Sequence, residues 1–352
     1  MALSEVMTSS APVDHGFHAL RIKDVVRETA EANSFVLDVP ADMREAFAYE
    51  SGQFCNFRVW VDGQPFVRCY SMSSAPGVDP DLRVTVKRVP DGVVSNWMND
   101  HLSPGDVVEV SRPAGFFRLV ECQGEGDIVA FSAGSGITPV LSLVKTAVAT
   151  TSQRVRLLYA NRDEDAIILR SEIDALAAHP RFTVSHHLDV EKGFVDRDAI
   201  DAFMAPAGGA EFYVCGPGPF MDVVEHTLLA GGVEEARIHI ERFTPEEWLP
   251  LPEPEPAGVT DAPTRVTIQI GARTETTDYH PGTTILQTAR QMGMSPPFSC
   301  ESGSCATCMA RLTEGTASMH VNNALTPEEV AEGWVLTCQA LPTSPTVHVV
   351  YE

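Results

Sequence analysis

The stretch Asp127-Ile-Val-Ala-Phe-Ser-Ala-Gly-Ser-Gly-Ile-Thr-Pro139 joins a compact apolar run to a glycine-rich turn. The apolar run predicts a buried strand, and the residues from Pro139 to about Val148 follow a helical pattern. The alternation continues with predicted strands at Val155–Ala160, Phe182–Val184 and Glu211–Val214 and a helix near Ser171–Ala178. Strand–helix repeats with short connections are typical of a doubly wound parallel sheet with helices on both faces. We expect this α/β domain to span residues 121–245.

Towards the N-terminus the pattern changes to short strands separated by turn formers. The predicted strands are Phe35–Val39, Phe54–Trp60, Leu82–Lys87 and Val107–Val110. Asp62-Gly63 and Pro104-Gly-Asp106 are typical turn sequences between them. Regular short strands of this kind favour an antiparallel β-barrel. We place this domain at residues 16–120, after an N-terminal tail of residues 1–15.

Towards the C-terminus a proline-rich segment precedes a third domain. Residues 248–258 carry four prolines, so we expect an extended, exposed linker, placed at residues 246–262. Beyond it, Arg265–Ile270 alternates as a strand. Thr284 and Gln287 have the spacing of a capping box, and apolar residues then recur at helical spacing until Gly293. The third domain should span residues 263–352.

Four cysteines lie close together in this third domain. Cys300, Cys305 and Cys308 follow the spacing C-x4-C-x2-C, and Cys338 comes later. This is the plant-type spacing for a 2Fe–2S cluster, which needs four thiolates. A structural zinc site and inert thiols are the alternatives, but zinc sites usually pair their cysteines in two short hairpins. We therefore predict Cys300, Cys305, Cys308 and Cys338 as the metal ligands.

Charge and hydropathy exclude several classes of partner. The 352 residues include 48 acidic and 25 basic side chains, for a net charge of −23. Nucleic acid would be repelled, because phosphate binding needs clustered lysine and arginine. The chain has no apolar run of about 18 residues that could span a membrane, and residues 1–15 lack the features of a secretory signal. We therefore expect a cytoplasmic protein with no nucleic-acid or membrane partner.

Residues 263–352 resemble a plant-type ferredoxin domain over its whole length, which implies a β-grasp fold. The resemblance rests on Gly282-Thr-Thr-Ile-Leu286, on the three-cysteine loop and on Leu336-Thr-Cys-Gln339. The residue after the first ligand is Glu301, where many members carry arginine, so the local surface charge differs.

Three segments of the barrel domain, in chain order, resemble the flavin domain of the ferredoxin–NADP reductase superfamily. They are Arg68-Cys69-Tyr70-Ser71, Thr85-Val86-Lys87 and Gly92-Val93-Val94-Ser95. The resemblance implies that Arg68 binds the pyrophosphate, that Tyr70 stacks on the flavin and that Ser71 lies near flavin N5. The segment from Gly92 would bind phosphate at a helix N-terminus. The alternative is a plain barrel strand with an exposed arginine. The strand that carries Lys87 and the complete segment from Gly92 to Asn96 resemble the FAD-binding members more than the FMN-binding ones, which implies FAD rather than FMN.

The glycine-rich turn of the α/β domain is a candidate pyridine-nucleotide site. Gly134, Gly136, Thr138 and Pro139 open the predicted helix, where backbone N–H groups would bind a pyrophosphate. Later, Cys215-Gly216-Pro217 resembles the second nucleotide motif of the superfamily, which implies that Cys215 lies beside the nicotinamide. The alternative for Cys215 is an ordinary buried thiol.

Two further segments bear on the nucleotide. Arg162 is followed by three acids within Asp163–Asp165, which would repel a 2′-phosphate, so we predict NADH over NADPH.

By resemblance, Phe243 would cover the flavin face and Glu241 would position the reacting rings. The alternative is a plain strand end with a core phenylalanine. The candidate catalytic residues are thus Ser71, Cys215, Glu241 and Phe243.

The domain order resembles that of oxygenase reductases, which carry flavin, nucleotide and ferredoxin domains in this order. The stretches Lys87–Trp97, Leu158–Arg162 and Met319–Leu325 favour the reductases of 3-ketosteroid 9α-hydroxylases, with those of phenylacetyl-CoA oxygenases also similar. This implies hydride transfer from NADH to FAD and single electrons through 2Fe–2S to a partner oxygenase of the Rieske type, with a steroid hydroxylase as the suggested acceptor. The alternatives are the reductase of a di-iron or other monooxygenase, a stand-alone NADH oxidase or diaphorase, and a non-enzymatic redox carrier or sensor.

Overall fold

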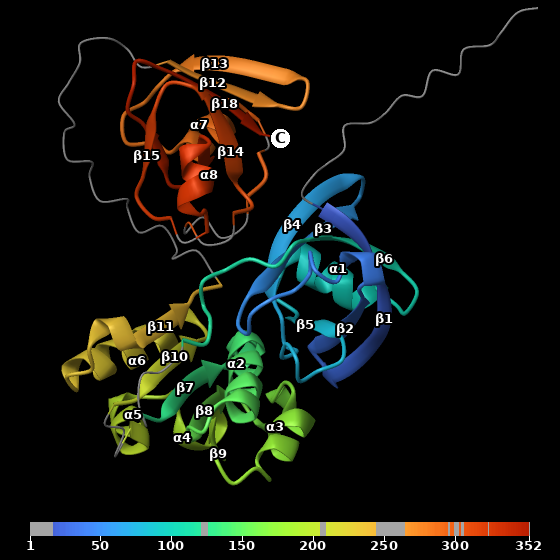
Figure 1. Ribbon diagram of the computed structural model, residues 1–352, viewed down its shortest axis with the longest axis vertical. Coiled ribbons are helices and arrows are strands. Elements are labelled where there is room, and N and C mark those ends of the chain that lie inside the picture. Colours follow the sequence, from blue (N-terminus) through green and yellow to red (C-terminus); the bar gives the residue numbers. More distant parts are fainter. Residues whose placement is uncertain are drawn as a thin grey trace, which may run out of the picture.

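The structure is a computed structural model that describes residues 17–120, 126–204, 209–243, 265–294, 296–298, 303, 306–322 and 324–351. The predicted N-terminal tail and the predicted proline-rich linker lie outside the described residues. Figure 1 shows the described residues as three lobes, coloured blue, green to yellow, and orange to red along the chain. In the part of the chain that the structure describes, no helix is long and apolar enough to cross a membrane.

The first lobe is a six-stranded antiparallel sheet in the order β4-β3-β6-β1-β2-β5. Its elements are β1 (Phe17–Thr29), β2 (Ala32–Asp38), β3 (Phe54–Val61), β4 (Gln64–Ser71), β5 (Leu82–Lys87), α1 (Val93–His101) and β6 (Val107–Ser111). A bridge between Met72 and Val84 links the end of β4 to β5, so the sheet closes on itself. Phe35, Phe57 and Met98 are among the side chains that fill its interior. The prediction of an antiparallel barrel is confirmed.

The second lobe is a five-stranded parallel sheet in the order β11-β10-β7-β8-β9. Its strands are β7 (Ile128–Ala133), β8 (Val155–Asn161), β9 (Phe182–Leu188), β10 (Glu211–Cys215) and β11 (Ile238–Glu241). Its helices are α2 (Ile137–Thr150), α3 (Arg170–Leu176), α4 (Asp189–Lys192), α5 (Arg197–Met204) and α6 (Gly218–Ala230).

Alternate residues of these strands pack into two separate cores. Ile128 and Ala130 belong to the core that also contains α2 and α3 residues, whereas Val129 and Phe131 belong to the core that contains α5 and α6 residues. Burial on both faces explains why every residue of β7 is buried and why all but Ser132 are apolar. The predicted doubly wound sheet is confirmed.

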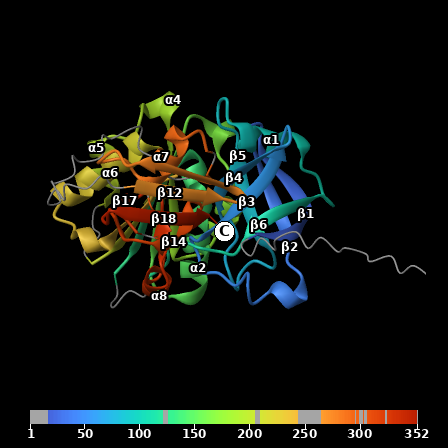
Figure 2. The ribbon, with the colours of Figure 1, turned by 90° about the horizontal axis from the view of Figure 1, so that it is seen from above.

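The third lobe contains a mixed sheet in the order β13-β12-β18-β14-β16 and a two-stranded sheet of β15 and β17. Its elements are β12 (Arg265–Ile270), β13 (Arg273–Asp278), α7 (Ile285–Gln291), β14 (Met309–Glu314), β15 (Ala317–Met319), α8 (Pro327–Ala331), β16 (Trp334–Leu336), β17 (Ala340–Pro342) and β18 (Thr346–Tyr351). The predicted capping box is present, because Thr284 and Gln287 bond to each other's backbone N–H groups. Figure 2 shows this lobe from above, over the α/β lobe and next to β3 and β4 of the barrel.

Charged side chains join the barrel to the α/β lobe. Lys145 Nζ on α2 lies 2.6 Å from Asp79 Oδ2 and 2.7 Å from Glu172 Oε2. Arg83 Nη1 on β5 lies 2.5 Å from Glu172 Oε1 on α3. Asp79 and Arg83 belong to the barrel, and Lys145 and Glu172 to the α/β lobe. Because all four side chains are largely buried, the network holds the two lobes in one orientation.

Replacing Glu172 with glutamine is expected to lower the free energy of unfolding at pH 7 by about 1–3 kcal/mol, because two cations lose a partly buried anion. Burial raises the pKa of Glu172, but Arg83 and Lys145 outweigh it, and the pKa lies below its ordinary value. The carboxylate therefore stabilises the fold above the ordinary glutamate pKa, and this contribution is lost as the pH falls through the lowered pKa. Urea unfolding as a function of pH measures both effects.

The matched control is Asp174→Asn, since Asp174 lies on the same helix in an exposed ion pair with Arg170. Exposed pairs contribute at most about 1 kcal/mol, so this change should have little effect. Equal destabilisation by the two variants would contradict the role of the Glu172 network.

Candidate cofactor sites

The predicted nucleotide-binding glycines lie at the carboxyl edge of the parallel sheet. β7 leads into a turn at Gly134–Gly136, and α2 begins at Ile137. Gly134 has a φ of +52°, a left-handed conformation that glycine adopts without steric cost. The Ile137 N–H donates to the carbonyls of Gly134 and Ser135, so the turn and the 14-residue α2 form one continuous helical N-terminus. The N–H groups of the first turn of such a helix have no acceptor further back in the helix. This edge therefore fits the pyrophosphate of a dinucleotide.

Gly136 and Gly216 allow two backbone segments to touch. A Cβ atom on Gly136 would overlap the carbonyl oxygen of Cys215. A Cβ atom on Gly216 would lie 2.8 Å from Cδ1 of Phe220 and 3.1 Å from Cβ of Ala133. The two segments that the sequence analysis assigns to the nucleotide are thus packed against each other.

The other predicted residues of these motifs lie at the same edge. Thr138 and Pro139 are buried in the first turn of α2, and the Thr138 hydroxyl donates to the carbonyl of Ser135 at 3.1 Å. Pro217 is exposed and is the residue directly before α6.

Cys215 and Glu241 are neighbours across the sheet. Both are the last residues of their strands, and they are paired in the register of β10 and β11. Cys215 is fully buried, and its burial, together with the nearby Glu241 charge, raises the pKa of the thiol. The thiol therefore stays neutral at physiological pH. Phe243 follows two residues after Glu241 and is 39% exposed, so its ring is available to cover a ligand.

The predicted flavin residues of the barrel lie at the end of β4. Ser71 is buried and paired with Phe54 of β3. The ring of Tyr70 packs edge to face against Phe57, with centroids 5.6 Å apart, and burial raises the pKa of its hydroxyl. Arg68 is half-buried, and its guanidinium donates to the carbonyl of its neighbour Val67 at 2.7 Å. Cys69 lies between Arg68 and Tyr70 and is paired with Asn56 of β3.

Of the three predicted residues on β5, Lys87 lies nearest to the nucleotide turn. Its Nζ is 3.7 Å from the position that a Cβ atom on Gly134 would take, so a barrel cation faces the α/β lobe. The Thr85 hydroxyl is bonded to the hydroxyls of Ser34 and Ser73, at 2.7 Å each. Val86 is fully buried in the barrel core. Only Lys87 thus has its polar group directed to the other lobe.

The predicted phosphate segment forms the start of α1. Gly92 is the N-cap, Val93 is exposed and Val94 is buried. The Ser95 hydroxyl accepts a hydrogen bond from the backbone N–H of Val89 at 3.1 Å. The free N–H groups of this nine-residue helix can bind a phosphate, and the Ser95 hydroxyl keeps a proton to donate.

Arg162 lies directly after β8 and is exposed. Its Nε donates to Asp163 Oδ2 at 2.8 Å, and Nη1 lies 3.8 Å from Glu31 of the barrel. The hydrogen bond from Arg162 lowers the pKa of Asp163, so this carboxylate is ionised at neutral pH. The positive charge of Arg162 is thus already balanced by anions.

Two of the four predicted cluster ligands are described, and they lie close together. Cys308 and Cys338 are buried in one apolar cluster with Leu286, Leu325 and Leu336. Cys300 and Cys305 lie outside the described residues. Buried thiols on adjacent segments, surrounded by apolar side chains, fit an iron–sulfur cluster.

Thr337 and Tyr351 support this region, and sequence reasoning did not single them out. The Thr337 hydroxyl donates to the carbonyl of Cys308 at 2.8 Å, and the Tyr351 hydroxyl donates to Thr337 Oγ1 at 2.8 Å. Thr337 directly precedes the predicted ligand Cys338, so its position in the sequence could have indicated a contact with the cluster region. Nothing near Tyr351 in the sequence indicates the second, because strand β18 is brought there by the fold.

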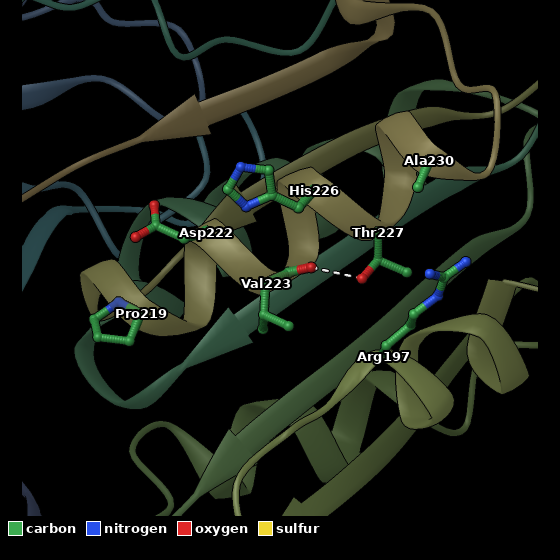
Figure 3. Close-up of a pocket in the computed structure, with 7 residues that line it drawn as sticks. All are labelled: Arg197, Pro219, Asp222, Val223, His226, Thr227 and Ala230. Carbon is green, nitrogen blue, oxygen red and sulfur yellow. Dashed lines mark hydrogen bonds between the residues drawn. The ribbon is translucent and has the colours of Figure 1, made fainter.

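A separate groove lies between α5 and α6 and has a volume of about 550 Å³. Figure 3 shows it, lined by Arg197, Pro219, Asp222, Val223, His226, Thr227 and Ala230, with the Thr227 hydroxyl bonded to the carbonyl of Val223. None of the predicted cofactor residues lines it, so it is distinct from the sites above.

Three family models match the chain, one for each lobe. An oxidoreductase FAD-binding domain matches residues 19–119, an oxidoreductase NAD-binding domain matches residues 131–226, and a 2Fe-2S iron-sulfur cluster binding domain matches residues 268–343. The cofactors that the sequence predicted, FAD, NAD and 2Fe–2S, are confirmed.

The chain is similar to known reductases over almost its whole length. The 3-ketosteroid-9-alpha-monooxygenase ferredoxin reductase component of Rhodococcus rhodochrous is 37% identical, with 96% of this chain and 98% of that protein covered. A component of the 1,2-phenylacetyl-CoA epoxidase of Escherichia coli is 30% identical, with 96% and 98% covered. The solved structure of phthalate dioxygenase reductase shares the fold, with a TM-score of 0.62, 24% identity, and 97% of this chain and 100% of that chain covered.

Proposed function

This chain belongs to the ferredoxin reductase components of oxygenase systems, and we propose that it takes electrons from NADH and delivers them to a Rieske-type oxygenase that hydroxylates a 3-ketosteroid. The observation that carries the choice of oxygenase is the 37% identity to a 3-ketosteroid-9-alpha-monooxygenase reductase component, against 30% to the component of the phenylacetyl-CoA epoxidase. The steroid would bind the oxygenase and not this chain. The proposed domain boundaries are 16–120, 121–245 and 263–352.

The nucleotide would bind across the carboxyl edge of the parallel sheet. N–H groups at the start of α2, next to Gly134 and Gly136, would hold the pyrophosphate. Lys87 reaches this turn from the barrel and supplies a positive charge between the two lobes. The flavin pyrophosphate would lie at Arg68 and at the start of α1.

Bound FAD supplies the conversion of a two-electron hydride into single electrons that a 2Fe–2S cluster accepts. The residues of this chain orient the reacting rings. The neutral thiol of Cys215 can lie against the nicotinamide without placing a charge there, and Glu241 lies beside it at the sheet edge. Phe243, which is 39% exposed, would cover the open side of the rings, and the buried Ser71 hydroxyl at the end of β4 would face the flavin. Together they would exclude water from the transfer of hydride.

The ion pair between Arg162 and Asp163 supports NADH as the donor. A 2′-phosphate next to β8 would meet the Asp163 carboxylate, and the Arg162 guanidinium is already paired. Like charges of this kind disfavour binding, so we expect NADH at equal, low concentration to reduce the flavin about 10-fold or more faster than NADPH. Anaerobic bleaching of the flavin absorption by each nucleotide measures this. Equal rates with the two nucleotides would overturn the assignment of NADH.

The acceptor is tested with purified oxygenase components. A 3-ketosteroid 9α-oxygenase should turn over with NADH and this chain, whereas the oxygenase component of a phenylacetyl-CoA epoxidase should be reduced much more slowly. The reverse preference would overturn the steroid assignment and favour a di-iron monooxygenase. NADH oxidation that is independent of either oxygenase would favour a stand-alone oxidase.

A further inference from the structure

A hydrogen bond connects the cluster loop of the third lobe to the barrel. The Thr307 hydroxyl donates to Oδ1 of Asn56 at 2.8 Å, although the two residues are 251 positions apart in the chain. Thr307 directly precedes the predicted ligand Cys308. Asn56 lies on β3, opposite Cys69 in the register of β4, and Cys69 is flanked by Arg68 and Tyr70 of the predicted flavin segment. The bond therefore joins the predicted cluster loop to the strand pair β3–β4, which carries the predicted flavin residues.

Both ends of this hydrogen bond are held in place by their own lobes. The backbone N–H of Asn56 donates to the Ser111 hydroxyl at 2.9 Å, which ties β3 to β6, and Asn56 is 7% exposed. On the other side, the N–H of Met309 donates to the carbonyl of Ala306 at 2.9 Å and forms a tight turn around Thr307. The Cys308 carbonyl is fixed by Thr337. A bond between two such rigid supports restricts how the cluster loop can move relative to the barrel.

We propose that Asn56 and Thr307 form a latch that positions the cluster loop to receive electrons from the flavin, an inference that rests on the proposed function. For each NADH converted to NAD⁺, one hydride leaves the nicotinamide, two electrons pass one at a time through the cluster to the acceptor, and one proton is released. The rate of each single-electron step falls steeply with the distance between the donor and the acceptor. A residue pair that holds the cluster loop against the barrel therefore controls electron transfer from flavin to cluster and leaves hydride transfer unaffected. Both are positioning residues.

The test uses the holoenzyme and two variants that remove the hydrogen bond while nearly conserving shape, Asn56→Leu and Thr307→Val. In anaerobic stopped-flow experiments, NADH should bleach the flavin at the parental rate in both. Transfer from flavin to cluster should be slower by about fivefold, the scale set by the loss of one hydrogen bond. The double variant should be no slower than the slower single variant, because the second change has no bond left to remove. Thr313→Val on β14, in the same lobe, is the matched control and should be unchanged.

A second readout does not depend on turnover. Small-angle X-ray scattering of the full chain should give a larger radius of gyration for Asn56→Leu than for the parent and for Thr313→Val. Unchanged visible and electron paramagnetic resonance spectra of the reduced cluster would show that the ligands themselves are intact. Asn56 lies outside the cluster lobe, so its variant keeps the test decisive if Thr307→Val loads its cluster poorly.

The latch proposal would be overturned if Asn56→Leu transferred electrons from flavin to cluster at the parental rate. It would also be overturned if the slowing in the double variant were the product of the slowing in the two single variants. Failure of the proposed function gives a different result. In that case the parent protein itself would show no transfer from flavin to cluster after NADH is added.

Discussion

Replacing Cys308 with alanine is expected to remove the iron–sulfur absorption and to slow NADH-driven reduction of the oxygenase by about 100-fold or more. Loss of a residue that merely supports a ligand already weakens metal sites by about 10- to 100-fold, so loss of the thiolate itself should have at least this effect. Bleaching of the flavin by NADH should persist, because the barrel and the α/β lobe do not depend on the thiol. Visible spectra before and after the addition of NADH separate the two steps.

The structure makes this substitution informative about the thiol alone. The backbone N–H and the hydroxyl of Thr337 both donate to the Cys308 carbonyl, and an alanine at position 308 keeps these bonds. Cys55→Ala is the matched control, because Cys55 is also fully buried but lies in the barrel core, with its thiol against the Met72 sulfur. The control should retain the iron–sulfur spectrum. Retention of that spectrum in Cys308→Ala would contradict the assignment of this ligand.

The sequence predicted those parts of the sites whose chemistry depends on short-range spacing. The glycines around residues 134–136 mark a turn that only a small residue permits, and the strand before them is apolar because both of its faces are buried. Cys215 and Glu241 each end a predicted strand of one parallel sheet, so their proximity followed from the fold class.

Contacts between distant segments were beyond such reasoning. Neither the bond from Thr307 to Asn56 nor the ion pairs between Lys145, Asp79 and Glu172 leave a local pattern, because each depends on how separate lobes meet. The long strand β1 also escaped prediction. Its pairing with β2 contains two register shifts, which interrupt the alternation of buried and exposed residues on which strand prediction depends.

Replacing Gly136 with alanine is expected to slow bleaching of the flavin by NADH by about 100-fold, since a displacement of about 1 Å at a reacting site has this scale of effect. The new Cβ atom would overlap the carbonyl oxygen of Cys215, so the turn before α2 and the segment at Cys215 must separate. That separation moves the N–H groups proposed to hold the pyrophosphate and the thiol proposed to lie beside the nicotinamide. Reduction of the flavin by dithionite should be unchanged, because it needs no nucleotide site.

Gly218→Ala provides the matched control in the same lobe. Gly218 is the first residue of α6, and a Cβ atom there would meet no other atom within 4 Å. The same chemical change should therefore leave the NADH reaction at the parental rate. Comparable slowing by both variants would mean that the effect of Gly136→Ala comes from general destabilisation of the lobe. Slowing by Gly136→Ala alone would tie hydride transfer to the contact between the two nucleotide motifs, since that contact is what the added methyl group disrupts.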